Sequence, residues 1–180
     1  MSHLFGSAAV QLLRKEGTVA AADALAGKTH VLVYFSAHWC PPCRSFTPRL
    51  KEFYDRHHDT HRFEVLFVSS DNSAEEMMSY LGAHHGDWLA LSYHDAQTIG
   101  RSWTHQYGLF SIPSLLVLEN NAERRVVTSH GRDMVLRDPE ALGFAWPNSM
   151  AIINADRRRF MKKVAAAVVL VVLLVTLMIW

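Results

Sequence analysis

Two cysteines separated by two prolines carry the clearest chemistry in this 180-residue sequence. Cys40 and Cys43 are its only cysteines, and they stand between an apolar run and a predicted helix. A Cys-x-x-Cys pair in that position is typical of thiol–disulfide exchange. A helix N-terminus would lower the pKa of the Cys40 thiol from about 8.5 to about 7, so Cys40 would attack a partner disulfide and Cys43 would resolve the mixed disulfide. Pro41 and Pro42 lack N–H groups, and we expect them to modulate the reduction potential.

A zinc site is the main alternative use of these cysteines. Together with His57 and His61 they match a two-cysteine, two-histidine ligand spacing. If residues 43 to 57 form one helix, however, Cys43 and His57 lie about 21 Å apart, too far to share one ion. We therefore expect no metal, and an inert buried cysteine pair is the remaining alternative.

The elements that must position the cysteines alternate between strand and helix. Residues 30–36 and 63–69 are apolar runs of β-forming residues, typical of strands buried on both faces. Residues 44–59 between them have apolar side chains at helical spacing, which predicts a right-handed βαβ unit. The sequence also predicts strands at 7–13, 114–118 and 125–129, an extended segment at 88–91, and helices at 20–26, 73–84, 98–107 and 139–143.

Composition narrows the function classes. The formal charge of +1 gives no reason to expect a nucleic-acid partner. Two cysteines are too few for a secreted, disulfide-stapled fold, and the first residues lack the basic and apolar regions of a signal peptide. We therefore expect the cysteines to face a reducing compartment.

The C-terminal segment differs in kind from the rest. Basic residues crowd 157–163, and residues 164–180 are apolar except for Thr176, about 26 Å as a helix. This pattern predicts a globular domain over 1–147, a basic linker over 148–163 and a transmembrane tail anchor over 164–180, with a helix of the core as the alternative. Because the predicted span ends the chain, we expect the domain on the cytosolic side of the membrane, which agrees with the basic flank. The mitochondrial outer membrane and the endoplasmic reticulum are both compatible with this span.

Several motifs, beginning with YFSAHWCPPCRSFTP at 34–48, carry a family resemblance. The others are VSSD at 68–71, WLA at 88–90, YGL at 107–109, SIPS at 111–114, GR at 131–132 and FAWP at 144–147. With these motifs, residues 30–147 resemble the tryparedoxin/nucleoredoxin branch of the thioredoxin superfamily, which includes forms with a hydrophobic C-terminal tail. The resemblance implies an α/β fold, a thioredoxin-like central mixed sheet flanked by helices, followed here by one transmembrane helix.

The resemblance also implies roles for single residues. Cys40 would be the nucleophile and Cys43 the resolving thiol, with Trp39 shaping the surface beside them. Pro113 would be a cis-proline against the cysteine pair, and the Ile112 backbone would pair with a substrate chain. The other implied site residues are Tyr34, which replaces the buried aspartate of ordinary thioredoxins, Asp71, for which helix capping and proton transfer are both open, and Arg132 near the rim.

The function implied is electron transfer from a small dithiol, trypanothione, to disulfides of proteins such as peroxiredoxins, with no bound cofactor. The alternative is a membrane-tethered, nucleoredoxin-like sensor or scaffold that binds partners without rapid turnover. The sequence departs from the tryparedoxin pattern at His38, Ser70 and Asn72. These differences concern the identity of the reductant more than the thiol–disulfide exchange itself.

Overall fold

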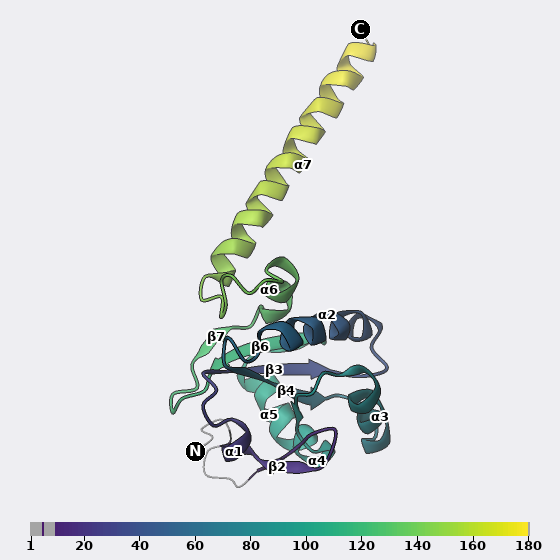
Figure 1. Ribbon diagram of the computed structural model, residues 1–180. Coiled ribbons are helices and arrows are strands. Elements are labelled where there is room, and N and C mark those ends of the chain that lie inside the picture. Colours follow the sequence, from purple (N-terminus) through teal and green to yellow (C-terminus); the bar gives the residue numbers. More distant parts are fainter. Residues whose placement is uncertain (1–4, 6–9, 180) are drawn as a thin grey trace. The chain divides into compact units, whose positions relative to one another are not determined.

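The computed structural model describes Phe5 and residues 10–179, without the side chains of residues 177 and 179. The chain forms two compact units, one ending at Pro147 and the other beginning at Asn148. The first unit is an α/β domain around a seven-stranded mixed sheet with the strand order β2-β1-β5-β4-β3-β6-β7 (Figure 1).

The strands of the sheet are short except at its centre. They are β1 (Gln11–Leu13), β2 (Thr18–Ala20), β3 (His30–Ser36), β4 (Phe63–Ser69), β5 (Leu89–Ala90), β6 (Ser114–Glu119) and β7 (Val126–Thr128). Strand β3 pairs in parallel with β4 and antiparallel with β6, so its backbone is hydrogen-bonded on both sides. The predicted central strands at 30–36 and 63–69 are confirmed to the residue.

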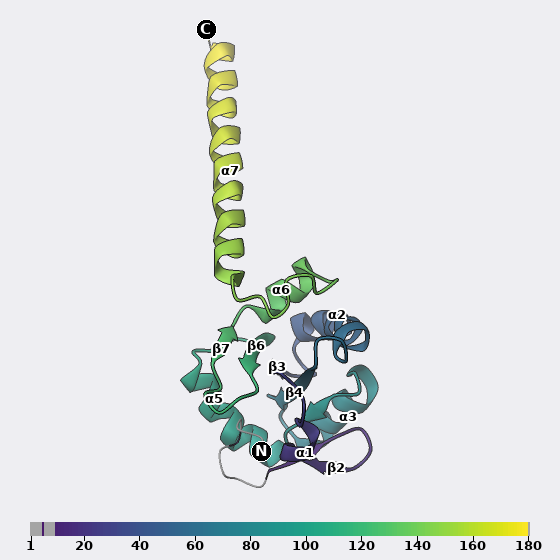
Figure 2. The same cartoon turned by 60° about the vertical axis from the view of Figure 1, so that its left-hand side comes forward.

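Helices cover both faces of the sheet (Figure 2). They are α1 (Ala21–Ala24), α2 (Pro41–His57), α3 (Ala74–His84), α4 (Tyr93–Asp95), the π-helix η2 (Ala96–Gly100), α5 (Arg101–Gln106) and α6 (Gly131–Arg137). Alternate side chains of β3 point to opposite faces. Leu32 and Tyr34 join a core with α2, α3 and α6, whereas Val31, Val33 and Phe35 join a second core with α1, η2 and α5. The α/β class with a central mixed sheet is therefore confirmed.

The structure corrects the predicted elements after residue 129. The predicted helix at 139–143 is wrong: those residues form turns, and the helix is α6, eight residues earlier. Asp138 organises the turns, because its carboxylate accepts hydrogen bonds from the N–H groups of Leu142 (2.9 Å) and Gly143 (2.8 Å) and from the Trp146 indole (2.8 Å).

Two smaller differences concern the N-terminal half and the segment after β5. Strand β2 was not predicted, and it forms the antiparallel partner of β1. The predicted strand over 7–13 is shorter, and its residues 7–9 lie outside the described residues. The predicted helix over 98–107 begins earlier, because α4, η2 and α5 follow one another from Tyr93 to Gln106.

The second unit is the single helix α7 (Ser149–Ile179). It takes in most of the predicted linker and of the predicted membrane span in one continuous element. Within the part of the chain that the structure describes, no helix is both long and apolar enough to cross a bilayer. The transmembrane span over 164–180 is therefore not confirmed and stays a prediction.

Candidate active site

The two cysteines form a disulfide at the N-terminus of α2, with their Cα atoms 5.2 Å apart. Cys40 is the N-cap residue, and its Sγ accepts the N–H of Cys43 at 3.4 Å. The same N–H would stabilise a Cys40 thiolate after reduction, together with the helix dipole. Cys43 is fully buried and Cys40 is 4% exposed, so the N-terminal sulfur is the more accessible of the two.

The Cys-Pro-Pro-Cys sequence explains how α2 begins here. Strand β3 ends at Ser36, and the N–H of Cys40 bonds back to the carbonyl of Ala37 at 3.3 Å, closing a tight turn. Pro41 and Pro42 occupy the first two helical positions, where no N–H is needed within the helix. Both prolines are exposed, so they form part of the surface that a partner would meet.

Trp39 covers the surface beside the disulfide. Its side chain is about half exposed, and its indole N–H donates to the carbonyl of Ser70 at 3.0 Å. This bond ties the indole to the residue that follows β4. The placement agrees with the predicted shaping role, which itself stays a prediction.

The loop before β6 lies against the disulfide from another side. The Ile112–Pro113 peptide bond is cis, as the resemblance implies. The carbonyl oxygen of Ile112 lies 3.9 Å from the Cys40 Sγ, and its side chain packs on Ala37, Cys40 and Cys43. The pairing of Ile112 with a substrate backbone stays a prediction.

Beneath Cys43 lies a buried cluster of four hydroxyl groups, from Tyr34, Ser36, Thr47 and Tyr80. Thr47 donates to the Cys43 carbonyl at 2.9 Å, and its oxygen lies 2.8 Å from the Tyr34 hydroxyl and 2.6 Å from the Tyr80 hydroxyl. Ser36 donates to Tyr34 at 3.0 Å. Burial raises the pKa of Tyr34 far above its ordinary value, so this residue stays a neutral hydroxyl.

This hydroxyl cluster was largely missed in the sequence, which singled out Tyr34 alone. The spacing of Thr47, four residues after Cys43 on α2, was a usable signal, because such residues lie one helical turn apart. Tyr80 comes from α3, and its approach depends on the packing of distant elements.

Asp71 ties the active-site loop to the end of β4. Its carboxylate accepts the backbone N–H of His38 at 2.7 Å and the hydroxyl of Ser69 at 2.8 Å, and the residue is buried. Of the two roles left open, helix capping goes to another residue, because Ser73 is the N-cap of α3 and accepts the Glu76 N–H at 3.2 Å. Proton transfer by Asp71 stays a prediction.

Arg132 lies on the exposed first turn of α6. Among the described residues the structure records no contact between its side chain and the disulfide. Its placement at the rim therefore stays a prediction.

The alternative zinc set does not come together. Helix α2 is continuous from Pro41 to His57, which separates Cys43 from His57 by about 21 Å. Both thiols are committed to the disulfide, and His57 lies instead against the Pro139 carbonyl, 2.9 Å from its Nε2. These four residues cannot share one ion.

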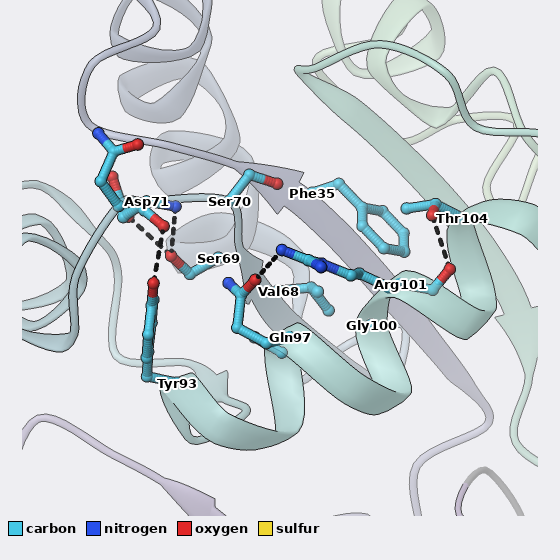
Figure 3. A pocket seen from close by; sticks show the side chains of 12 residues that line it. Phe35, Val68, Ser69, Ser70, Asp71, Tyr93, Gln97, Gly100, Arg101 and Thr104 are labelled. Atoms are coloured by element: carbon cyan, nitrogen blue, oxygen red, sulfur yellow. Dashed lines mark hydrogen bonds between the residues drawn. The ribbon is translucent and has the colours of Figure 1, made fainter.

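A pocket of about 340 Å³ opens next to this site, between the end of β4 and the helices η2 and α5 (Figure 3). Ser70 and Asp71 form one wall, and they are the residues that hold Trp39 and the His38 backbone. The opposite wall includes Gln97 and Arg101. This pocket could not be predicted from the sequence, because its walls come from separate elements.

Comparison with known proteins gives consistent relatives. A family model described as Thioredoxin-like matches residues 27–124. Tryparedoxin of Trypanosoma brucei brucei is 40% identical over 140 residues, 78% of this chain and 93% of the relative. Nucleoredoxin of Bos taurus is 42% identical over 136 residues, 75% of this chain but only 30% of that longer protein.

A solved structure of tryparedoxin II complexed with glutathionylspermidine is 39% identical, with a TM-score of 0.72. The match covers 81% of this chain and 96% of that one. These relatives, together with the Cys40–Cys43 pair at a helix N-terminus, show that the protein is a thioredoxin-like oxidoreductase. The chain belongs to the thioredoxin-like family, and within it to the tryparedoxin/nucleoredoxin type.

Proposed function

We propose that this oxidoreductase passes electrons from a small dithiol, trypanothione, to disulfides of proteins such as peroxiredoxins. The observation that carries the proposal is the Cys40–Cys43 disulfide, held between the helix N-terminus, Trp39 and the cis-proline loop. A relative, tryparedoxin II, has a solved structure complexed with glutathionylspermidine, which supports a reductant of the glutathione–spermidine class.

The reaction runs in two exchanges. A thiolate of the dithiol attacks the Cys40 sulfur and Cys43 leaves as a thiolate; the second thiol of the dithiol then displaces Cys40, so the dithiol is oxidised to its disulfide. The Cys40 thiolate next attacks the acceptor disulfide, and Cys43 attacks Cys40 to release the reduced acceptor. Two electrons and two protons pass from dithiol to acceptor in each cycle.

A second candidate function is a redox sensor or scaffold that binds partners without rapid turnover. The nucleoredoxin relatives, 42% identical in the case of Bos taurus, favour it as an alternative. The rate of turnover distinguishes the oxidoreductase from the sensor, because a sensor need not cycle quickly with any reductant.

We also propose that residues 164–180 attach the protein to a lipid bilayer, with the domain on the cytosolic side of the mitochondrial outer membrane or the endoplasmic reticulum. The support is compositional: the segment is apolar except for Thr176, and a basic cluster precedes it.

The reductant is tested by offering trypanothione, glutathione and a thioredoxin reductase system separately to the protein, with insulin as the acceptor. The proposal predicts the fastest insulin reduction with trypanothione. Equal, slow rates with all three would contradict it and favour the sensor.

A further inference from the structure

Cationic side chains crowd about two turns of α7 directly before its apolar run. They are Arg157, Arg158, Arg159, Lys162 and Lys163, and we call them the basic collar. All of them are exposed, and the structure records no ion pair for any of them among the residues it describes. Their charges are therefore available to a partner of opposite charge.

The basic collar surrounds the helix instead of marking one face. Helix α7 runs without a break from Ser149 to Ile179, so successive side chains point about 100° apart (Figure 1). Relative to Arg157, the other four cations point at about 100°, 200°, 140° and 240°, which leaves no gap wider than about 120°. A helix that lies flat on a bilayer has its cations on one face. The collar instead fits a helix that enters the bilayer end-on.

The run beyond the collar is likewise apolar on every side. The side chains from Val168 to Leu174 are each more than half exposed, and together they cover about two turns. A second copy of the helix would cover one stripe of this surface and leave the rest in water. The hydrocarbon of a bilayer would cover all sides at once, so lipid is the partner that fits this surface.

The collar also has a suitable extent along the helix axis. From Arg157 to Lys163 the rise is about 9 Å, at about 1.5 Å per residue. Each headgroup layer of a bilayer is about 5–7 Å thick, because the whole bilayer exceeds its hydrocarbon core by about 10–15 Å. With the apolar run in the hydrocarbon, the long side chains of the collar would reach this layer with their charged ends.

We propose that the basic collar binds anionic lipid headgroups, so that the protein attaches preferentially to bilayers with a negatively charged surface. The guanidinium and ammonium groups donate hydrogen bonds to the phosphate and carboxylate oxygens of these lipids. This inference rests on the proposed attachment of residues 164–180 to a bilayer, and it names the class of lipid.

Flotation of the full-length protein tests the collar with two kinds of vesicle, phosphatidylcholine alone and phosphatidylcholine mixed with phosphatidylserine. The lipid concentration that floats half of the protein measures the affinity. We expect an affinity at least about tenfold higher for the anionic vesicles, because each cation near an anionic surface contributes up to about a fivefold factor. Raising the NaCl concentration from about 0.1 M to about 1 M shortens the screening length from about 10 Å to about 3 Å and should remove most of this preference.

A variant without the collar and a matched control locate the preference. The collar variant combines Arg157→Gln, Arg158→Gln, Arg159→Gln, Lys162→Gln and Lys163→Gln. It should bind both kinds of vesicle with equal affinity, and still float through its apolar run. The control removes as many exposed cations from the domain, by Lys15→Gln, Arg44→Gln, Arg49→Gln, Arg62→Gln and Arg101→Gln. It should keep the wild-type preference; an equal loss in the control would overturn the proposal, because net charge alone would then explain the preference.

Single substitutions test the arrangement of the collar around the helix. Arg157→Gln and Arg159→Gln remove cations that point about 160° apart. Each should lower the preference for anionic vesicles by a similar factor, about two- to fivefold. A loss in only one of the two variants would mean that the helix lies flat with a single basic face, and would overturn the end-on collar.

The wild-type result also separates failure of the collar from failure of the attachment. Flotation with equal affinity for both kinds of vesicle would overturn the collar and leave the attachment in place. No flotation with either kind would overturn both.

Discussion

At the scale of single residues, Cys43, which we propose to be the resolving thiol, lies beside a cluster of buried hydroxyl groups. Thr47 links the Cys43 carbonyl to the hydroxyls of Tyr34 and Tyr80, and all of these groups are buried. A carboxylate that takes part in proton transfer would therefore have to lie outside this cluster. Asp71 is a buried acid whose carboxylate is hydrogen-bonded to the active-site loop at His38.

Tyr34→Phe removes the hydroxyl that Ser36 and Thr47 use as a partner. We expect the free energy of unfolding to fall by about 1–2 kcal/mol, because buried hydroxyls lose hydrogen bonds without gaining water. Urea unfolding measures the change. The matched control is Tyr107→Phe, at a half-buried tyrosine for which the described contacts include no hydroxyl hydrogen bond; a loss as large in the control would contradict the argument.

His85 predicts a pH dependence of stability. Burial, and to a lesser degree the nearby His84 and Lys15, lower its pKa from 6.5 to about 3. Below pH 6.5 the unfolded chain therefore binds a proton that the folded protein does not, and stability falls as the pH drops from about 6.5 toward about 3.

His85→Gln keeps an acceptor for the Trp88 indole, which donates to His85 at 3.1 Å, and removes the titration. Between pH 7 and pH 5 the wild type should lose roughly 2 kcal/mol more unfolding free energy than this variant. Urea titrations at both pH values measure the difference. His84→Gln, at an exposed neighbour, should follow the wild type; parallel losses in wild type and His85→Gln would refute the assignment.

The residues of the site differ in whether a short stretch of sequence is enough to predict their role. The Cys40–Cys43 pair at a helix N-terminus could be predicted from its place between a strand and a helix, whereas the cis bond before Pro113 was implied only by the family resemblance. Ser36, Tyr80 and the Ser70 partner of Trp39 could not be predicted, because they meet the site only after β3, β4 and α3 have packed.

At the scale of elements, the strongly patterned segments were predicted best. Strands β3 and β4 are continuous apolar runs, and α2 has a regular apolar face, so local sequence suffices for them. Helix α6 was missed because it has only seven residues and begins with a glycine, a poor helix former. Helix α6 is held in place by its packing on β6, and this packing cannot be predicted from the local sequence.

Two glycines test that packing. In Gly131→Ala the added Cβ would lie 2.7 Å from the carbonyl oxygen of Leu115 in β6, so α6 must shift, and we expect a loss of about 1–3 kcal/mol in unfolding free energy. In Gly82→Ala, within α3, nothing lies within 4 Å of the added Cβ. That variant should gain about 0.5–1 kcal/mol from helix propensity. Chemical unfolding measures both changes in unfolding free energy. A loss in Gly131→Ala with a gain in Gly82→Ala would support the packing of α6 on β6, and an unchanged stability in Gly131→Ala would contradict it.

At the scale of the whole molecule, the proposed attachment to lipid makes its own prediction. The full chain should float with vesicles of phosphatidylcholine and phosphatidylserine, and a fragment ending at Asp156 should stay in solution, because it lacks residues 164–180. The fragment with vesicles and the full chain without them are the controls. A full chain that does not float would contradict the attachment and leave the redox chemistry untouched.

The central claim concerns the cycle of the two thiols, and insulin reduction with trypanothione by the wild type, Cys40→Ser and Cys43→Ser tests it most directly. The account predicts turnover in the wild type, none in Cys40→Ser, and a Cys43→Ser protein that accumulates mixed disulfides through Cys40, seen by mass spectrometry. Turnover that survives Cys40→Ser, or no wild-type turnover with any of the reductants, would contradict it.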